Sequence, residues 1–204
     1  MTYQLSTCLI RHLRDACIPI LFLLHFLYLL HKLVHIHEKL QLKGLSNYAF
    51  ETEGFLPHIT LADFEDLPLN KAVTTLTNDL LIPQPIPITF NSLGSFLGTN
   101  IVFLSPVISP ALASLHLRIH ELFSDNVSVD SLYGPESWQP HLTLANRIDP
   151  TNFPKLYELC HQHFSKMESK IVGLKLIHID SPNKISSLFD YSFVQESSSD
   201  LKLS

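Results

Sequence analysis

Cysteine and charged side chains are both scarce in this chain. Only three of its 204 residues are cysteines (Cys8, Cys17 and Cys160), and no two of them form a Cys-x-x-Cys pair. The sequence therefore indicates neither a disulfide framework nor a cysteine zinc site, and we expect a cytoplasmic protein. Charged residues make up 16% of the chain and hydrophobic residues 46%. This balance excludes a wholly disordered polymer and predicts a packed globule of one domain or two small lobes.

Basic residues are the scarcer class of charge. The chain has 14 Lys and Arg residues against 19 Asp and Glu residues, which gives a formal net charge of −5. An acidic protein is poorly suited to gripping long nucleic acid through an extended basic surface. A short or end-bound phosphate substrate stays compatible with this charge, and we expect the protein to be a monomer.

A run without charge lies near the N-terminus. Residues 16–31 contain no Asp, Glu, Lys or Arg. The run is shorter than the roughly 18 to 20 residues that cross a bilayer, and Pro19 and His25 interrupt it. We therefore expect residues 20–42 to form a buried or partner-covered helix that stops at Gly44, with membrane association as the less favoured alternative.

The rest of the chain mixes helical and strand patterns, which predicts an α+β fold. A disordered tail is expected over residues 195–204. The predicted strands are 3–9, 48–51, 58–64, 86–90, 94–98, 100–104, 141–145 and 172–179, and the predicted helices after residue 44 are 70–81, 111–123 and 149–170.

One hexapeptide occurs twice. Pro-His-Ile-Thr-Leu-Ala at 57–62 recurs as Pro-His-Leu-Thr-Leu-Ala at 140–145, so that the two histidines are 83 residues apart. Each copy follows a turn-rich stretch and precedes a predicted helix, which indicates one structural unit used twice. A duplicated unit usually packs about a pseudo-two-fold axis, and the two histidines would then face each other.

Strand geometry predicts how each copy is oriented. Residues two apart in a strand point to the same face, so His58 lies beside Thr60 and His141 beside Thr143, while the apolar residues between them turn to the core. Two imidazoles can divide the roles of general acid and general base, and hydroxyls can hold the oxygens of a tetrahedral anion. No carboxylate cluster or cysteine ligand set accompanies the motif, so we expect acid–base catalysis without a metal.

With these two motifs the sequence resembles the 2H phosphoesterase superfamily, which includes 2′-5′ RNA ligase-like proteins and cyclic phosphodiesterases and is marked by two H-x-[TS]-x motifs. The resemblance covers about 44–180. It implies a bilobal, duplicated α+β fold with two antiparallel sheets and outer helices around a central cleft. It also implies a cofactor-free phosphoesterase that acts on 2′,3′-cyclic phosphates or 2′-5′ phosphodiesters of RNA ends or small nucleotides.

The N-terminus departs from the family pattern, because its strand is faint and its helix candidate is apolar on all sides. We accordingly divide the chain into an atypical apolar segment over 1–43 that completes the first lobe, a two-lobed domain over 44–194, and the tail. Two alternatives stay open: a catalytically weak protein that binds nucleotides or RNA ends, and a membrane-associated protein that uses the apolar segment.

Four further side chains are candidates for the cleft. Tyr133 and Trp138 precede it in a loop, where an aromatic ring could stack on a base, although Trp138 is favoured as a packing anchor. Arg147 shares a face with His141 if the strand continues that far, and it could bring positive charge to a phosphate. Phe96, between two glycines, could line the cleft, but a core position is favoured.

Three more pairs of histidines have suggestive spacing. No third ligand and no His-Glu-x-x-His motif accompanies them, so we expect ordinary helix-surface or interface residues rather than a metal site. The pairs are His31 with His35, His116 with His120, and His161 with His163.

Overall fold

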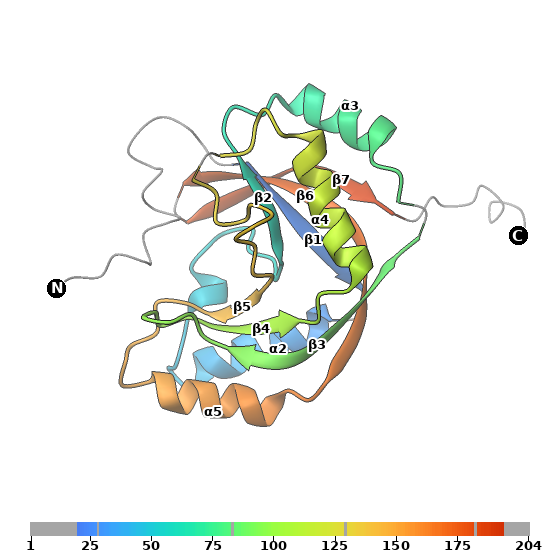
Figure 1. Ribbon diagram of the computed structural model, residues 1–204. Helices are drawn as coiled ribbons and strands as arrows, with labels where there is room; N and C mark the ends of the chain where they lie inside the picture. Colours follow the sequence, from blue (N-terminus) through green and yellow to red (C-terminus); the bar gives the residue numbers. More distant parts are fainter. Residues whose placement is uncertain (1–19, 28, 83, 129, 182, 194–204) are drawn as a thin grey trace, which may run out of the picture.

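The computed structural model describes residues 20–27, 29–82, 84–128, 130–181 and 183–193. Within them lie seven strands, four α-helices and a short 3-10 helix, which confirms the predicted α+β class (Figure 1). In chain order the elements are β1 (Ile20–Leu27), α2 (Leu30–Leu42), η2 (Tyr48–Phe50), β2 (Thr60–Phe64), α3 (Leu69–Asp79), β3 (Ile86–Gly94), β4 (Val102–Pro106), α4 (Pro110–Leu122), β5 (Leu142–Ala145), α5 (Phe153–His163), β6 (Met167–Ser181) and β7 (Lys184–Ser192).

The strands form one antiparallel sheet in the order β2-β1-β6-β3-β4-β5, with β7 on β6. The sequence predicted two sheets, whereas hydrogen bonding through the 15-residue β6 joins all the described strands into one. The first residues of β6 pair with β3, and the residues from Gly173 onward pair with β7. The duplicated, bilobal arrangement itself stays a prediction.

Residues 20–27 form a central strand, so the helix predicted to start at residue 20 is wrong in its first part. β1 pairs with β2 on one side and with β6 on the other, and Leu23, Leu24 and Phe26 are buried. A continuous apolar run suits a fully buried strand as well as a buried helix, and periodicity cannot separate the two. The helix begins only at Leu30, where the pattern becomes amphipathic.

Helix α2 buries one face, with Leu33, Ile36, His37 and Leu40 at helical spacing. No helix in the described ranges is long and apolar enough to span a membrane.

Other expected elements are confirmed or corrected by the structure. The strands expected at 58–64, 86–90, 100–104, 141–145 and 172–179, and the helices at 70–81 and 111–123, are present with shifted ends. Residues 48–50 form a 3-10 turn instead of a strand, and 95–98 are a loop after β3. The helix predicted over 149–170 covers only 153–163, β7 was not predicted, and the expectations for 3–9 and 195–204 fall outside the described residues.

The helices cover the sheet in two pairs. Figure 1 shows α3 and α4 over the half that contains β2, β6 and β7, and α2 and α5 at the opposite end of the molecule. Contacts of α4 with β2, of α3 with β7, and of α2 with β5 and α5 agree with this arrangement. Each helix buries apolar side chains on one face, such as Leu112, Leu115 and Ile119 of α4.

The free edge of β2 is covered by the chain that follows α4. Val127 forms a bridge with Phe64, and the Ser128 amide donates a 3.3 Å hydrogen bond to the Asp63 carbonyl. An edge strand presents unpaired backbone groups that must find partners. The segment that leads to the second motif therefore runs along the strand of the first.

Candidate active site

The two repeated histidines make the same local hydrogen bond. Nδ1 of His58 lies 2.6 Å from the carbonyl oxygen of Leu56, and Nδ1 of His141 lies 2.8 Å from that of Gln139. Since a carbonyl only accepts, Nδ1 carries the proton in each ring, which leaves Nε2 of the neutral imidazole as an acceptor. Both copies of the motif thus fix the same tautomer.

The second motif alternates between buried and half-buried residues as predicted, whereas in the first motif Thr60 is buried together with its apolar neighbours, and both strands begin later than expected. β2 starts at Thr60 and β5 at Leu142, so each histidine lies just ahead of its strand. The apolar residues of both copies are fully buried: Ile59, Leu61, Leu142 and Leu144. Thr60 is 8% exposed and Thr143 is half-buried.

The pKa values of both imidazoles are lowered, mainly by burial. Burial lowers the pKa of His58 below its usual 6.5, the Leu56 carbonyl opposes this shift, and the charge of His141 lowers the pKa further. Burial likewise lowers the pKa of His141, against the Gln139 carbonyl. The prediction that these two histidines, 83 residues apart in the sequence, face each other agrees with this electrostatic effect of His141 on His58.

Aromatic rings lie beside both histidines. Phe55 lies with its ring centroid 6.1 Å from that of His58. Phe96 makes an edge-to-face contact with His141 at 4.9 Å, and Phe103 lies at 5.4 Å. Phe96 is half-buried against Phe103 and therefore lines the second histidine instead of lying in the core. These rings restrict where each imidazole can turn.

Tyr48 belongs to the site, and the sequence reasoning missed it. Burial raises its pKa to about 12, while a hydrogen bond with the Thr143 side chain and the positive charge of Arg147 oppose the shift. The phenol therefore stays protonated and can hold the threonine hydroxyl. Tyr48 lies on the 3-10 turn ten residues before His58, where the sequence predicts a strand, and no signal in the local pattern marks it.

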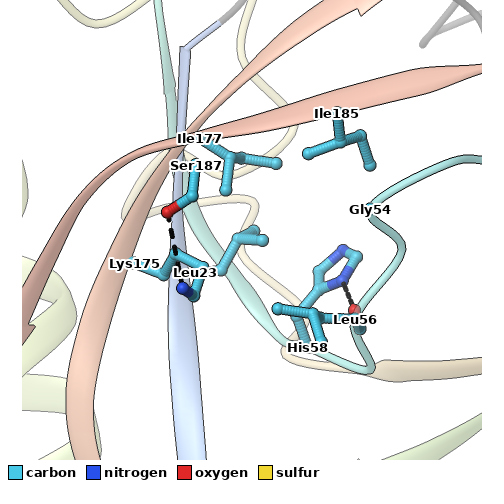
Figure 2. A pocket seen from close by; sticks show the side chains of 8 residues that line it. All are labelled: Leu23, Gly54, Leu56, His58, Lys175, Ile177, Ile185 and Ser187. Atoms are coloured by element: carbon cyan, nitrogen blue, oxygen red, sulfur yellow. Dashed lines mark hydrogen bonds between the residues drawn. The ribbon is translucent and has the colours of Figure 1, made fainter.

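A pocket opens beside His58 (Figure 2). Lys175 on its wall is 17% exposed and pairs with Asp190 at 2.5 Å, and its Nζ lies 3.4 Å from the Ser187 hydroxyl. The other lining side chains are mostly aliphatic and come from β1, β6, β7 and the 54–58 loop: Leu23, Gly54, Leu56, Ile177 and Ile185. A second pocket shares His58 and Lys175 and reaches α2.

The loop ahead of His58 is bonded to β7. The Ile185 amide donates to the Glu53 carbonyl at 2.9 Å, and the Glu53 amide donates to the Asn183 carbonyl at 2.8 Å. Gly54 has φ +80° and a Cβ there would collide with the Ile185 carbonyl, so only glycine fits this close approach. The glycine thus sets the wall of the pocket next to His58.

A known protein family matches most of this sequence. Residues 32–183 match the family described as the 2′-5′ RNA ligase superfamily. The chain belongs to this superfamily. No curated protein sequence matches it at a significant level.

Several solved structures share the fold of this member of the 2′-5′ RNA ligase superfamily. LigT of E. coli in complex with 3′-AMP has 13% identity and a TM-score of 0.59, with 88% of this chain and 99% of LigT covered. The LigT complex with ATP has 14% identity and a TM-score of 0.54 at the same coverage. TT0787 of Thermus thermophilus has 18% identity and a TM-score of 0.57, covering 88% of this chain and all of that one.

Arg147 reaches the site of this superfamily member by a route that the sequence did not predict. β5 ends at Ala145 and Arg147 has φ +53°, so strand alternation does not extend to it. Its guanidinium instead pairs with Glu51, close enough to Tyr48 to affect the pKa of the phenol. Arg147 stays a predicted phosphate contact, because the chain turns back after β5 and brings its guanidinium beside η2.

The two aromatic residues predicted in the loop before β5, Trp138 and Tyr133, differ in their contacts. Trp138 stacks on His116 with the ring centroids 3.8 Å apart and the planes at 2°, and its Nε1 donates to the Thr60 carbonyl at 2.9 Å. This confirms the favoured packing role for Trp138. The Tyr133 carbonyl accepts a 2.7 Å hydrogen bond from His116 Nε2, and its half-buried ring stays a predicted substrate contact.

In the part of the chain that the structure describes, no group of three or more His, Cys, Asp or Glu side chains could hold a metal ion. The expectation of surface or interface residues is wrong for His116 and His120, which are buried on α4, where their rings bond to backbone carbonyls. His35 lies against His163, with ring centroids 5.6 Å apart.

Proposed function

We propose that the protein is a phosphoesterase in which His58 and His141 act as a general acid–base pair on a 2′,3′-cyclic phosphate or a 2′-5′ phosphodiester of an RNA end or small nucleotide. The observation that carries the proposal is the shared hydrogen bond from Nδ1 to a carbonyl two residues upstream, which leaves both Nε2 atoms for proton transfer. Superfamily membership supports the reaction class.

In the proposed hydrolysis, one neutral imidazole takes a proton from water at Nε2 as the water oxygen bonds to phosphorus. The bond from phosphorus to a ribose oxygen breaks, and the other imidazole, which is protonated, gives its Nε2 proton to that leaving oxygen. The near-identical bonding of the two rings leaves open which of them takes which role.

Hydroxyl and guanidinium groups would stabilise the charge on the phosphoryl oxygens. The Thr60 and Thr143 hydroxyls can donate to nonbridging oxygens, and Tyr48 holds the Thr143 side chain in place. Arg147 adds positive charge from beside Glu51. Tyr133 is the proposed aromatic contact to a base.

The pocket beside His58 would receive the nucleoside part of the substrate. Its aliphatic walls suit a flat ring, and the Lys175 ammonium and Ser187 hydroxyl can bond to polar edges. The LigT structures with 3′-AMP and ATP give further support, because they show nucleotides bound to proteins of this fold.

The test is hydrolysis of 2′,3′-cyclic nucleotides and of 2′-5′-linked dinucleotides by the purified protein in excess EDTA. We expect turnover that falls on the order of 10²-fold or more in His58→Ala and in His141→Ala, as for loss of a positioned acid or base. His161→Ala, an exposed histidine on α5, serves as the matched control and should retain full activity.

Two results would count against the proposal. Full activity of either single variant would reject the paired mechanism. A folded wild-type protein that binds these nucleotides without converting them would favour the binding protein over the enzyme.

A further inference from the structure

Three ring nitrogens bond to backbone carbonyls around the first motif and the loop before the second. Trp138 Nε1 donates to the Thr60 carbonyl at 2.9 Å, and His120 Nε2 donates to the Leu61 carbonyl at 3.2 Å. His116 Nε2 donates to the Tyr133 carbonyl at 2.7 Å. Helix α4, strand β2 and the loop before β5 are therefore held together by side chains that the proposed chemistry does not use.

The bond from Trp138 joins the two chain segments that carry the histidines. Thr60 follows His58 by two residues, and Trp138 precedes His141 by three. The Ile59 carbonyl accepts from the Leu24 amide of β1, whereas the next carbonyl along β2, that of Thr60, bonds to the indole. One hydrogen bond thus connects the backbone of the first motif to the segment that presents the second.

His116 fixes the plane of the indole. The two rings are parallel within 2° at 3.8 Å, and His116 is 2% exposed. Burial lowers the pKa of His116 to about 4, so the ring is neutral near pH 7 and its N–H is used by the Tyr133 carbonyl. With its face covered by His116, the indole can turn little without breaking the bond to Thr60.

We propose that Trp138 is a positioning residue that sets the spacing of His58 and His141, with His116 holding its ring. The inference rests on the proposed function for its catalytic readout, although the positioning itself is a property of the fold. Small displacements of reacting groups lower catalysis strongly, because a proton transfer needs hydrogen-bond distance.

The test compares Trp138→Phe with Tyr157→Phe. The first change keeps an aromatic ring on His116 and removes the donor to Thr60. The second removes an equivalent bond, since the Tyr157 hydroxyl donates to the Leu93 carbonyl at 3.1 Å on the outer helix α5. Both variants should lose similar thermal stability, but only Trp138→Phe should lower kcat, on the order of tenfold, with KM nearly unchanged.

A second readout does not depend on turnover. The imidazole proton resonances of both His58 and His141 should shift in Trp138→Phe and stay in place in Tyr157→Phe. If kcat is unchanged in Trp138→Phe, or falls equally in both variants, the positioning role is overturned. If the wild-type protein has no activity, the proposed function fails, and the resonances alone decide: unshifted signals in Trp138→Phe overturn the role, and shifted signals uphold it.

Discussion

Acid should destabilise the folded protein through two buried histidines, His37 and His116. Burial lowers the pKa of each from 6.5 to about 4, against hydrogen bonds to carbonyls that raise it. His37 is 4% exposed, and its Nε2 has no hydrogen-bond partner among the described residues. In the unfolded chain both rings bind protons near their ordinary pKa of 6.5. Unfolding therefore takes up protons at any pH between about 4 and 6.5.

The sign and size follow from this difference. Stability is complete above pH 6.5 and is lost as the pH falls toward 4, because only the unfolded state is then protonated. Between pH 7 and pH 5 each ring should cost about 2 kcal/mol of unfolding free energy, or about 4 kcal/mol together. That is a large part of the stability of a typical domain, which is about 5 to 15 kcal/mol. His58 and His141 shift in the same direction and add to the loss.

The assay is urea denaturation of the wild type, His37→Gln and His116→Gln at both pH values. The free energy of unfolding should fall between pH 7 and pH 5 by about 2 kcal/mol less in each variant than in the wild type, whatever the variant does to stability at pH 7. His31→Gln is the matched control, since this histidine is exposed on the same helix as His37. If the free energy of unfolding falls between pH 7 and pH 5 by as much in both variants as in the wild type, the reasoning is refuted.

Two further predictions concern catalysis. The pH optimum of kcat/KM should lie below 6.5, because one of His58 and His141 must be protonated and both have lowered pKa values; an optimum above pH 7 in a pH–rate profile would contradict this. Tyr48→Phe should lower kcat/KM about fivefold through loss of roughly 1 kcal/mol of hydrogen bonding to Thr143, and should have little further effect in a Thr143→Ala background; equal effects in both backgrounds would show that Tyr48 acts elsewhere.

The repeated hexapeptide predicted the paired histidines because its information is local. A proline, a histidine, alternating apolar residues and a threonine predict a strand end with one buried face, and in both copies the two apolar residues are fully buried, although Thr60 is buried as well. The single hydrogen bond that fixes each tautomer is equally local, as it reaches only two residues back. That the two copies face each other depends on how distant parts of the chain pack, and it stays a prediction.

Elsewhere the sequence was ambiguous for physical reasons. The apolar run of β1 fits a buried strand and a buried helix equally, and the choice depends on its pairing with β2 and β6. β7 is largely polar and half-exposed, so it lacks an alternating signal and is stabilised by pairing with β6. Arg147 reaches Glu51 through a backbone with positive φ, which arginine adopts only where surrounding structure imposes it.

The two histidines share a tautomer but not an environment, and this difference can divide their roles. His58 borders both pockets, with Lys175 on the wall they share. His141 instead packs against Phe96 and Phe103. A substrate whose nucleoside fills the pocket would place its scissile bond in one direction relative to the pair. The assignment of acid and base would then depend on which ribose oxygen faces His58, so one site could use either histidine as the acid for substrates bound in opposite orientations.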